Sequence, residues 1–135
     1  MGNMIKVGMA DLKICKAPDA LTTLGLGSCI GACLYDPVVK IAGMVHYMLP
    51  DSTKIKSNQN IAKFGDTGIR ELIRLMEEAG ARKSRIVAKI AGGARMFAVS
   101  ASVNLPGLNV GENNIEAARL NLSENGIAII AEDVG

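Results

Sequence analysis

One cysteine of this chain follows a glycine-rich turn, and the next apolar segment carries the only histidine. Residues 23–29 read TLGLGSC and lead directly into an apolar run at 30–35. Glycine tolerates unusual backbone angles and lets other groups approach closely, so a thiol at the end of such a turn can meet a substrate. A cysteine and a histidine on neighbouring strands are the minimum equipment of a thiol nucleophile with a general base. The pattern therefore predicts a nucleophilic site that pairs Cys29 with His46.

Each of these residues also has a purely structural interpretation. Cysteine is among the most buried residue types, and most buried cysteines take no part in chemistry. His46 shares a strand face with Met44 and Met48, which is equally typical of a core histidine bonded to a carbonyl group. As the only histidine, however, it is the one side chain whose unperturbed pKa suits proton transfer near neutral pH. Thr23 is either an ordinary strand residue or the group that fixes the imidazole tautomer.

Other chemistries fit the sequence less well. Cys29, Cys33 and His46 supply at most three zinc ligands, and residues four apart on a strand are about 13 Å apart, too far for one metal ion. Gly25 and Gly27 begin a dinucleotide fingerprint, but position 30 is isoleucine and no helix is predicted to follow. We therefore expect neither a metal nor an organic cofactor.

The composition is that of a compact domain with an aliphatic core. Hydrophobic residues make up 49% of the 135 residues, with two tyrosines and two phenylalanines, and the net charge is +2. So few aromatic rings argue against a stacking platform for single-stranded nucleic acid. No apolar run approaches the roughly 20 residues that span a bilayer, and the N-terminal segment lacks the apolar core of a signal peptide. We expect a cytoplasmic protein with free thiols at Cys15, Cys29 and Cys33, the first and last in the core.

Seven apolar segments are predicted to be strands, and two periodic segments are predicted to be helices. The strands are expected at residues 5–8, 10–17, 21–26, 29–35, 41–49, 85–90 and 127–131. The helices are expected at 66–79, capped by Asp66 or Thr67, and at 112–123. Their inward stripes are Ile69, Leu72, Ile73 and Met76 in the first helix, and Ile115, Ala118 and Leu122 in the second.

Several of these segments carry further expectations. The strand at 41–49 is apolar on both faces, which is typical of a buried strand, and 127–131 is expected to be buried too. The polar interval 51–63 is predicted to be a surface loop with one helical turn, and 97–103 to be a strand or a loop. The glycine pair at 92–93 follows a strand, where it either allows close approach or forms a simple bend.

The order of the elements predicts the fold class. Strands come first, followed by helix, strand, helix and strand, which favours an α+β or layered α/β arrangement. We expect mixed β-sheets with two main helices packed on one side, in a single domain over residues 1–135. This order does not fit a doubly wound nucleotide-binding fold.

Six segments together match one family. They are TLGLGSC at 23–29, the Asp36-Pro37 turn, HYMLPDS at 46–52, the Asp66-Thr67 pair, KIAGGARMF at 89–97 and the closing AEDVG. With these segments the chain resembles the CheD family of chemoreceptor glutamine deamidases nearly from end to end. The resemblance implies a layered α/β/β fold in which mixed β-sheets form a sandwich. This fold is similar to that of toxin-type cysteine deamidases.

The resemblance also implies an activity and its residues. It implies a cysteine hydrolase, a protein-glutamine glutaminase, with a triad of Cys29, His46 and Thr23 that converts receptor glutamines to glutamate and ammonia. Some members also hydrolyse glutamyl methyl esters. Backbone N–H groups near Ser28 and Cys29 would hold the oxyanion, and Gly27 and Ser28 would support the turn. No metal or organic cofactor has a role in this chemistry.

The implied partners are the cytoplasmic helices of methyl-accepting chemotaxis receptors and a CheC-type phosphatase that acts on CheY-phosphate. We expect a monomer that neither binds nucleic acid nor inserts into a membrane. A rival hypothesis is a module that mainly binds and stimulates the phosphatase, with deamidation secondary or lost. A third hypothesis, a structural domain with inert thiols, predicts slow alkylation of Cys29.

Two departures from the family pattern concern the surface and the C-terminus. Members usually carry a basic residue at the position of Asn113, where a change affects surface contacts rather than chemistry. Members usually also continue past the final Val-Gly with a glycine-rich segment and a strand. That C-terminal strand is therefore expected to be missing here, which would expose a sheet edge.

Overall fold

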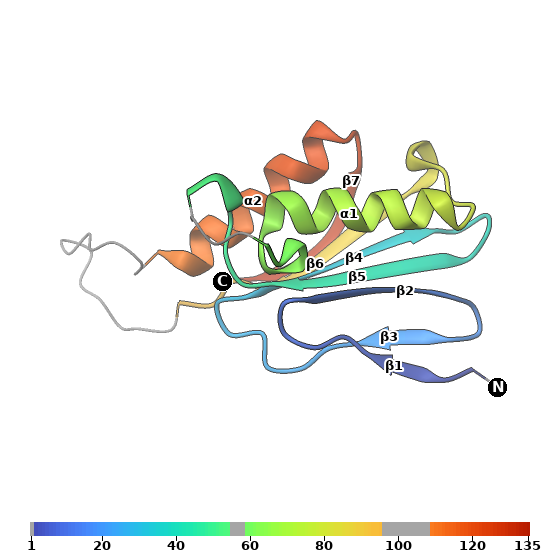
Figure 1. Cartoon of the computed structure of the whole chain (residues 1–135), viewed down its shortest axis with the longest axis horizontal. Coiled ribbons are helices and arrows are strands. Elements are labelled where there is room, and N and C mark those ends of the chain that lie inside the picture. Colours follow the sequence, from blue (N-terminus) through green and yellow to red (C-terminus); the bar gives the residue numbers. More distant parts are fainter. Residues whose placement is uncertain (1, 55–58, 96–108) are drawn as a thin grey trace.

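The described residues of this computed structural model, 2–54, 59–95 and 109–135, form three layers (Figure 1). A central five-stranded sheet has the order β2-β5-β4-β6-β7, and a small two-stranded sheet pairs β1 with β3. Both helices cover one face of the central sheet, and the small sheet lies on its other side (Figure 1). The expected mixed α/β fold, with two helices packed on one side, is confirmed.

The elements follow the predicted order with modest changes at their ends. The strands are β1 (Met4–Lys6), β2 (Asp11–Lys16), β3 (Ala20–Thr22), β4 (Ile30–Asp36), β5 (Ile41–Tyr47), β6 (Val87–Gly92) and β7 (Ala128–Val134). The helices are α1 (Gly65–Glu78) and α2 (Val110–Glu124), with short 3₁₀ turns at Ser52–Lys54, Ile61–Lys63 and Lys83–Arg85. Strands β2, β5, β4 and β6 pair antiparallel, while β6 and β7 pair parallel. Residues 97–103 lie outside the described part of the chain.

Strand β5 is apolar on both faces because it lies between the other two layers. Val45 and Tyr47 are fully buried and belong to the core shared with the helices. At Gly43 a Cβ atom would lie 2.7 Å from Leu72 Cδ1, so α1 packs directly against the strand backbone. Because side chains alternate along a strand, His46 is on the opposite face, toward the small sheet. The predicted inward stripes of both helices are confirmed, since all their members are buried.

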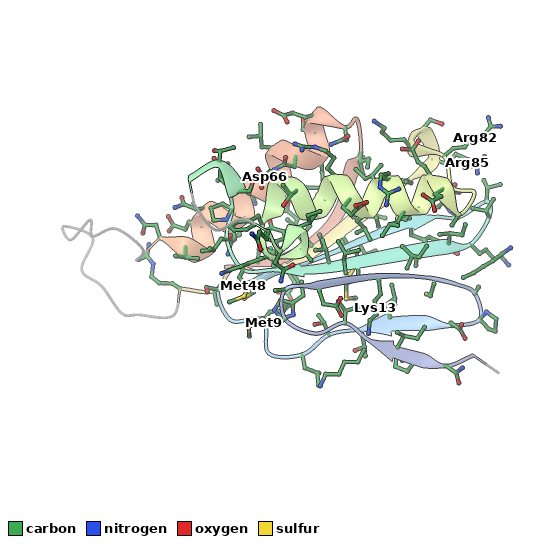
Figure 2. The ribbon with its side chains drawn as sticks, in the orientation of Figure 1. Met9, Lys13, Met48, Asp66, Arg82 and Arg85 are labelled. Atoms are coloured by element: carbon green, nitrogen blue, oxygen red, sulfur yellow. The ribbon has the colours of Figure 1, made fainter. Side chains whose placement is uncertain are left out.

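Three predictions about element ends and burial are wrong. Helix α1 begins after Phe64 without a side-chain cap, because the Asp66 carboxylate instead accepts hydrogen bonds from the backbone N–H (3.0 Å) and hydroxyl (2.8 Å) of Ser52 (Figure 2). Strand β7 is an edge strand, and Ile130 is 57% exposed rather than buried. Cys15 and Cys33 are half-buried free thiols and not core residues. Local apolar character could not reveal which strand would have a partner on only one side.

A buried carboxylate, that of Asp36, lies at the C-terminal end of β4. Asp36 is fully buried and accepts hydrogen bonds from Arg85 Nε (3.0 and 3.1 Å) and from the backbone N–H groups of Arg82 and Val38. Hydrogen bonding to the Arg85 guanidinium holds the pKa of this carboxyl well below its usual range, despite its burial. Arg82 and Arg85 come from the segment between α1 and β6 (Figure 2), so Asp36 ties that segment to the β4–β5 hairpin.

Neither α1 nor α2, the helices of the described residues, is long and apolar enough to cross a membrane.

Candidate active site

The structure brings Thr23 and His46 into direct contact. Thr23 follows β3 in the small sheet, and its Oγ1 lies 2.9 Å from His46 Nδ1 on β5. The same hydroxyl lies 2.7 Å from the carbonyl oxygen of Val7, in the segment between β1 and β2. The site is therefore built between the two β-layers, on the face of the central sheet that the helices do not cover.

The threonine contacts decide which nitrogen of His46 carries the proton. A hydroxyl has one proton, and a carbonyl oxygen can only accept. Both contacts are satisfied only if Thr23 donates to Val7 O and accepts from His46 Nδ1–H. The other ring nitrogen, Nε2, is then bare, and it has no hydrogen-bond partner among the described residues. His46 is thus held in the tautomer of a general base with Nε2 free to accept a proton.

A glycine on β4 makes room for this arrangement. Gly31 lies opposite His46 in the β4–β5 ladder. A Cβ atom there would lie 3.3 Å from Leu26 Cδ2 and 3.5 Å from Thr23 Cγ2, so both side chains pack over the bare strand beside the imidazole. The chain that leads to the cysteine thus folds back over the strand that follows it.

Cys29 stands at the end of the glycine-rich turn, immediately before β4. Its backbone N–H donates to Leu26 O (2.8 Å) and closes the turn, and Gly27 has a φ of +53°, which favours glycine. The residue is two positions before Gly31, the partner of His46, and so lies just before the paired segment of β4 and β5. The thiol makes no hydrogen bond to Nε2 in this structure, and such contacts in free enzymes are often long until substrate binds.

The glycine pair at the end of β6 approaches the cysteine itself. Gly93 N–H donates to Cys29 O (2.8 Å), and Ala94 N–H donates to Gly27 O (2.8 Å). At Gly92, whose φ is +106°, a Cβ atom would lie 2.1 Å from Cys29 O, where no side chain fits. The sequence left open an approach to a ligand or partner and a simple bend, whereas the structure shows an approach to the chain's own backbone.

Burial keeps both reacting groups neutral. It raises the pKa of the Cys29 thiol above its ordinary 9.0, an effect that the residue's own backbone N–H partly opposes. Burial also lowers the pKa of His46 below its ordinary 6.5. At neutral pH Cys29 is accordingly a thiol and His46 an uncharged imidazole. The arrangement suits proton transfer during attack better than a standing thiolate–imidazolium pair.

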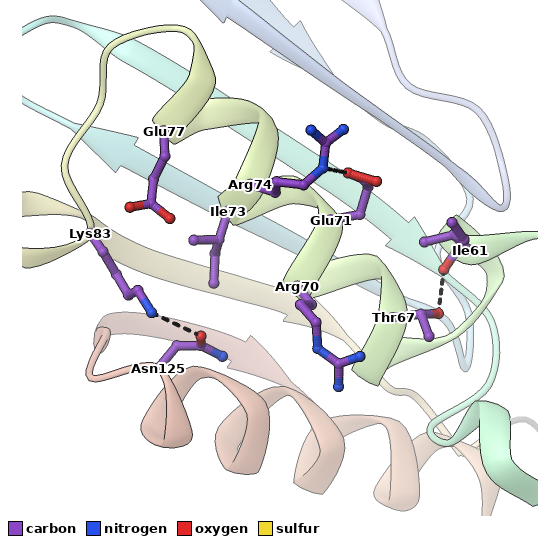
Figure 3. A pocket seen from close by; sticks show the side chains of 9 residues that line it. All are labelled: Ile61, Thr67, Arg70, Glu71, Ile73, Arg74, Glu77, Lys83 and Asn125. Atoms are coloured by element: carbon purple, nitrogen blue, oxygen red, sulfur yellow. Dashed lines mark hydrogen bonds and ion pairs between the residues drawn. The ribbon is translucent and has the colours of Figure 1, made fainter.

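Neither a metal site nor the groove between the two helices offers an alternative to this site. Across residues 2–54, 59–95 and 109–135, no three His, Cys, Asp or Glu side chains gather where they could hold a metal ion. A groove between α1 and α2 is lined by mixed charges, among them Arg70, Glu77 and Lys83 (Figure 3). It lies on the helix face of the sheet, whereas His46 is on the other face.

Comparison with known proteins identifies the family. A family model described as CheD chemotactic sensory transduction matches residues 48–135. The chain belongs to the CheD family. It is 61% identical over 135 residues to a probable chemoreceptor glutamine deamidase CheD of Lachnoclostridium phytofermentans, covering all of this chain and 83% of that protein. It is also 45% identical over 136 residues to the chemoreceptor glutamine deamidase CheD of Halalkalibacterium halodurans, with the same coverage.

The expected triad lies outside the family model, which begins at residue 48, after all three residues. The structure joins Thr23 to His46 directly, and Cys29 is two residues before Gly31, the β4 partner of His46. Sequence reasoning missed Asn114, a fully buried polar residue of α2. Its position four residues before Ala118, on the inward stripe, was an available signal.

Replacing Thr23 with valine is expected to remove the hydrogen bond that holds the His46 imidazole, while the shape of the side chain at position 23 hardly changes. Without the hydroxyl, His46 Nδ1–H loses its acceptor and the ring can populate the other tautomer or rotate. We expect the rate at which iodoacetamide alkylates Cys29 at pH 7 to fall by about 10- to 100-fold. Nitrogen NMR of the imidazole should report a protonated Nδ1 in the wild type and a mixture in the variant. Thr22→Val, one residue earlier on β3, is the matched control, and equal alkylation rates in all three proteins would contradict the role of Thr23.

Proposed function

We propose that this CheD-family deamidase hydrolyses glutamine side chains of chemoreceptors with Cys29 as nucleophile, His46 as general base and acid, and Thr23 as the residue that orients the imidazole. The single observation that carries the proposal is the tautomer of His46. A buried imidazole with Nδ1–H held by Thr23 and Nε2 unpartnered among the described residues is prepared to take a proton from a neighbouring thiol. A core histidine satisfied by a carbonyl group would have no such free nitrogen.

The chemistry proceeds in two halves. His46 Nε2 takes the thiol proton as the Cys29 sulfur bonds to the carboxamide carbon, and the carbonyl oxygen becomes an oxyanion. His46 then protonates the amide nitrogen, the C–N bond breaks, and ammonia leaves a thioester. Water adds to the thioester after giving a proton to Nε2, the C–S bond breaks, and the thiol regains its proton. The product is glutamate, and no cofactor enters the cycle.

The oxyanion is held by the turn before the nucleophile. The Cys29 N–H already donates to Leu26 O, whereas the N–H groups of Gly27 and Ser28 donate to no other described residue. A peptide N–H points opposite to the carbonyl of the same peptide. Because Gly27 O is bound by Ala94 N–H inside the protein, the Ser28 N–H points away from that contact. We therefore assign oxyanion binding to Gly27 and Ser28 rather than to the amide of Cys29.

The same intermediate accommodates a glutamyl methyl ester. Attack by Cys29 on the ester carbon gives an identical thioester, with methanol leaving in place of ammonia, so a methylesterase side activity follows from the same residues. The proposed partners are the cytoplasmic helices of chemoreceptors, as substrates, and a CheC-type phosphatase. The protein is proposed to act as a monomer in the cytoplasm.

The proposal is tested with purified protein and cytoplasmic fragments of chemoreceptors. Released ammonia is followed by a coupled enzymatic assay, and converted glutamines are found by peptide mass spectrometry. We expect ammonia and new glutamates in equal amounts, and no ammonia from fragments whose modified glutamines are replaced by leucine. Absence of ammonia with every receptor fragment would refute the activity.

A further inference from the structure

A buried asparagine on the helix side holds the two strand ends that carry the nucleophile and the base. Asn114 lies near the start of α2 and has no exposed surface. Its Nδ2 donates two hydrogen bonds of 2.9 Å each, one to Ser28 O and one to Met48 O. Ser28 directly precedes Cys29, and Met48 follows His46 by two residues at the end of β5 (Figure 2). A single side chain thus connects both halves of the proposed active site.

The orientation of the Asn114 amide is set by its acceptors. Both partners are carbonyl oxygens, so the reversed amide would bring Oδ1 against two acceptors and leave neither bonded. In the observed orientation Oδ1 is buried without a partner among the described residues. An unsatisfied buried acceptor is costly, and a leucine of similar size would avoid that cost. Leucine would, however, also leave Ser28 O and Met48 O without the donor that Asn114 gives them, so the amide acts here through its two N–H bonds.

The bond to Ser28 completes the fixation of the nucleophile turn. All four carbonyl oxygens of residues 26–29 accept hydrogen bonds. Their donors are Cys29 N–H for Leu26, Ala94 N–H for Gly27, Asn114 Nδ2 for Ser28 and Gly93 N–H for Cys29. Only the bond to Ser28 comes from a side chain, so it is the one that a substitution can remove without altering the backbone.

A second contact extends the same connection to the residue beside the base. Tyr47, the immediate neighbour of His46, is fully buried and donates its hydroxyl proton to the backbone carbonyl of Asn114. The end of β5 is therefore attached to α2 at both Tyr47 and Met48. Any shift of α2 along the sheet moves the base and the nucleophile turn together, which preserves their separation.

We propose that Asn114 is a positioning residue that sets the separation between the Cys29 sulfur and His46 Nε2 by bonding to Ser28 O and Met48 O. The inference rests on the proposed roles of Cys29 and His46. It adds to their site a residue of the helix layer, Asn114 on α2. Without the amide, Ser28 O is free to turn, and the thiol moves relative to the imidazole. Displacements of about 1 Å in such a pair can cost about 100-fold in rate.

Asn114→Leu tests this role, because leucine matches the volume and removes both hydrogen bonds. We expect kcat for glutamine hydrolysis to fall by about 10- to 100-fold with little change in KM. We also expect iodoacetamide alkylation of Cys29, followed by peptide mass spectrometry, to slow by a similar factor at pH 7 while remaining near the wild-type rate at high pH. The high-pH rate depends on the thiolate alone, whereas a general loss of folding would expose the buried thiol and raise its alkylation rate instead of lowering it.

Asp36→Asn is the matched control. Asp36 is an equally buried polar residue at the other end of β4, and its loss weakens the fold away from the site. It should lower the melting temperature at least as much as Asn114→Leu and leave the alkylation rate of Cys29 at pH 7 unchanged. If Asn114→Leu does not fold, Asn114→Ser, which keeps one donor, is expected to give an intermediate alkylation rate and to fold.

A folded Asn114 variant with wild-type alkylation at pH 7 and wild-type kcat would overturn the inference. Equal slowing of alkylation in Asp36→Asn would also overturn it, since the effect would then follow stability. Failure of the proposed function is a separate result, because wild-type protein would release no ammonia from receptor fragments. The alkylation comparison needs no receptor and still measures what Asn114 does to the thiol.

Discussion

Replacement of Cys29 by alanine is expected to abolish ammonia release from chemoreceptor fragments, with kcat/KM lower by at least about 10³-fold. The reason is that the thioester requires the sulfur, and no other described nucleophile stands beside His46 Nε2. Cys29→Ser is expected to be nearly as inactive, because a serine hydroxyl is far harder to deprotonate than a thiol for an imidazole with a lowered pKa. The measurement is ammonia released per folded enzyme, with glutamate formation confirmed by peptide mass spectrometry.

Cys33 offers a matched control for the cysteine substitution. It lies four residues further along on β4, and it is also a free thiol, half-buried, whose pKa is raised by burial. Cys33→Ala should therefore keep wild-type deamidation and wild-type stability within ordinary variation. Activity that survives in Cys29→Ala, or that is lost in Cys33→Ala, would contradict the assignment of the nucleophile.

Cys29→Ala also distinguishes the enzyme hypothesis from the rival hypothesis of a binding module. Alanine at position 29 removes only a sulfur atom from a residue that is 8% exposed, so the surface offered to a partner hardly changes. We expect Cys29→Ala to retain binding to a CheC-type phosphatase while losing ammonia release. Loss of both together would mean that one surface serves the two roles.

The parts of the site that depend on local pattern were predictable from sequence. Strict alternation in the 41–49 segment assigned His46 to the face opposite Val45 and Tyr47, and the structure has it there. The glycine-rich turn predicted an unusual backbone before Cys29, and the positive φ angles of Gly25 and Gly27 agree. Periods of two and of 3.6 residues are local properties, so they survive without knowledge of the fold.

The parts that depend on long-range contacts were not predictable in detail. Asp66 has the residue type and position of a helix cap, but Ser52, fourteen residues earlier, takes its carboxylate. Asn114 bonds to acceptors 86 and 66 residues away, a relation that no local pattern encodes. The edge position of β7 likewise follows from strand order, which leaves Ile130 exposed although its neighbours are apolar. Tertiary context overrides local preference at each of these positions.

The second large effect concerns His46 and the pH dependence of the reaction. His46→Ala is expected to lower kcat/KM at pH 7 by about 10²- to 10⁴-fold, the usual contribution of a positioned general base. In the wild type, burial lowers the pKa of His46, so the base form persists below the ordinary value of 6.5. As pH falls from 8, the midpoint of the decline in kcat/KM should therefore lie below pH 6.5. Cys29 alkylation should show the same acid limb, followed by a second rise above pH 9, where burial places the thiolate.

The control for this limb is the charged neighbour of His46. Asp11 lies opposite His46 on β2, and its carboxylate accepts the backbone N–H of Leu12 and contacts that of Gly8. Asp11→Asn should preserve the acid limb at its wild-type position, because burial and not the Asp11 charge lowers the pKa of His46. If Asp11→Asn lost the acid limb, our assignment of that limb to His46 would be wrong. Circular dichroism must accompany the titration, because protonating a buried histidine with a lowered pKa also destabilises the fold as pH falls below 6.5.

The pH profile on both sides of neutrality distinguishes a neutral pair from an ion pair. In an ion pair the imidazolium would lower the pKa of the thiol and the thiolate would raise the pKa of His46, so activity would persist on the acid side until the thiolate is protonated and decline on the alkaline side as the imidazolium loses its proton. A neutral pair transfers the thiol proton during attack, so kcat/KM should also fall in D₂O, whereas an ion pair has no proton to transfer at that step. His46→Ala should lose both the acid limb and the solvent isotope effect and keep only the alkylation rise above pH 9. A decline of kcat/KM on the alkaline side without an isotope effect would instead mean that the thiol is ionised before substrate arrives, and that Thr23 supports a charged imidazolium.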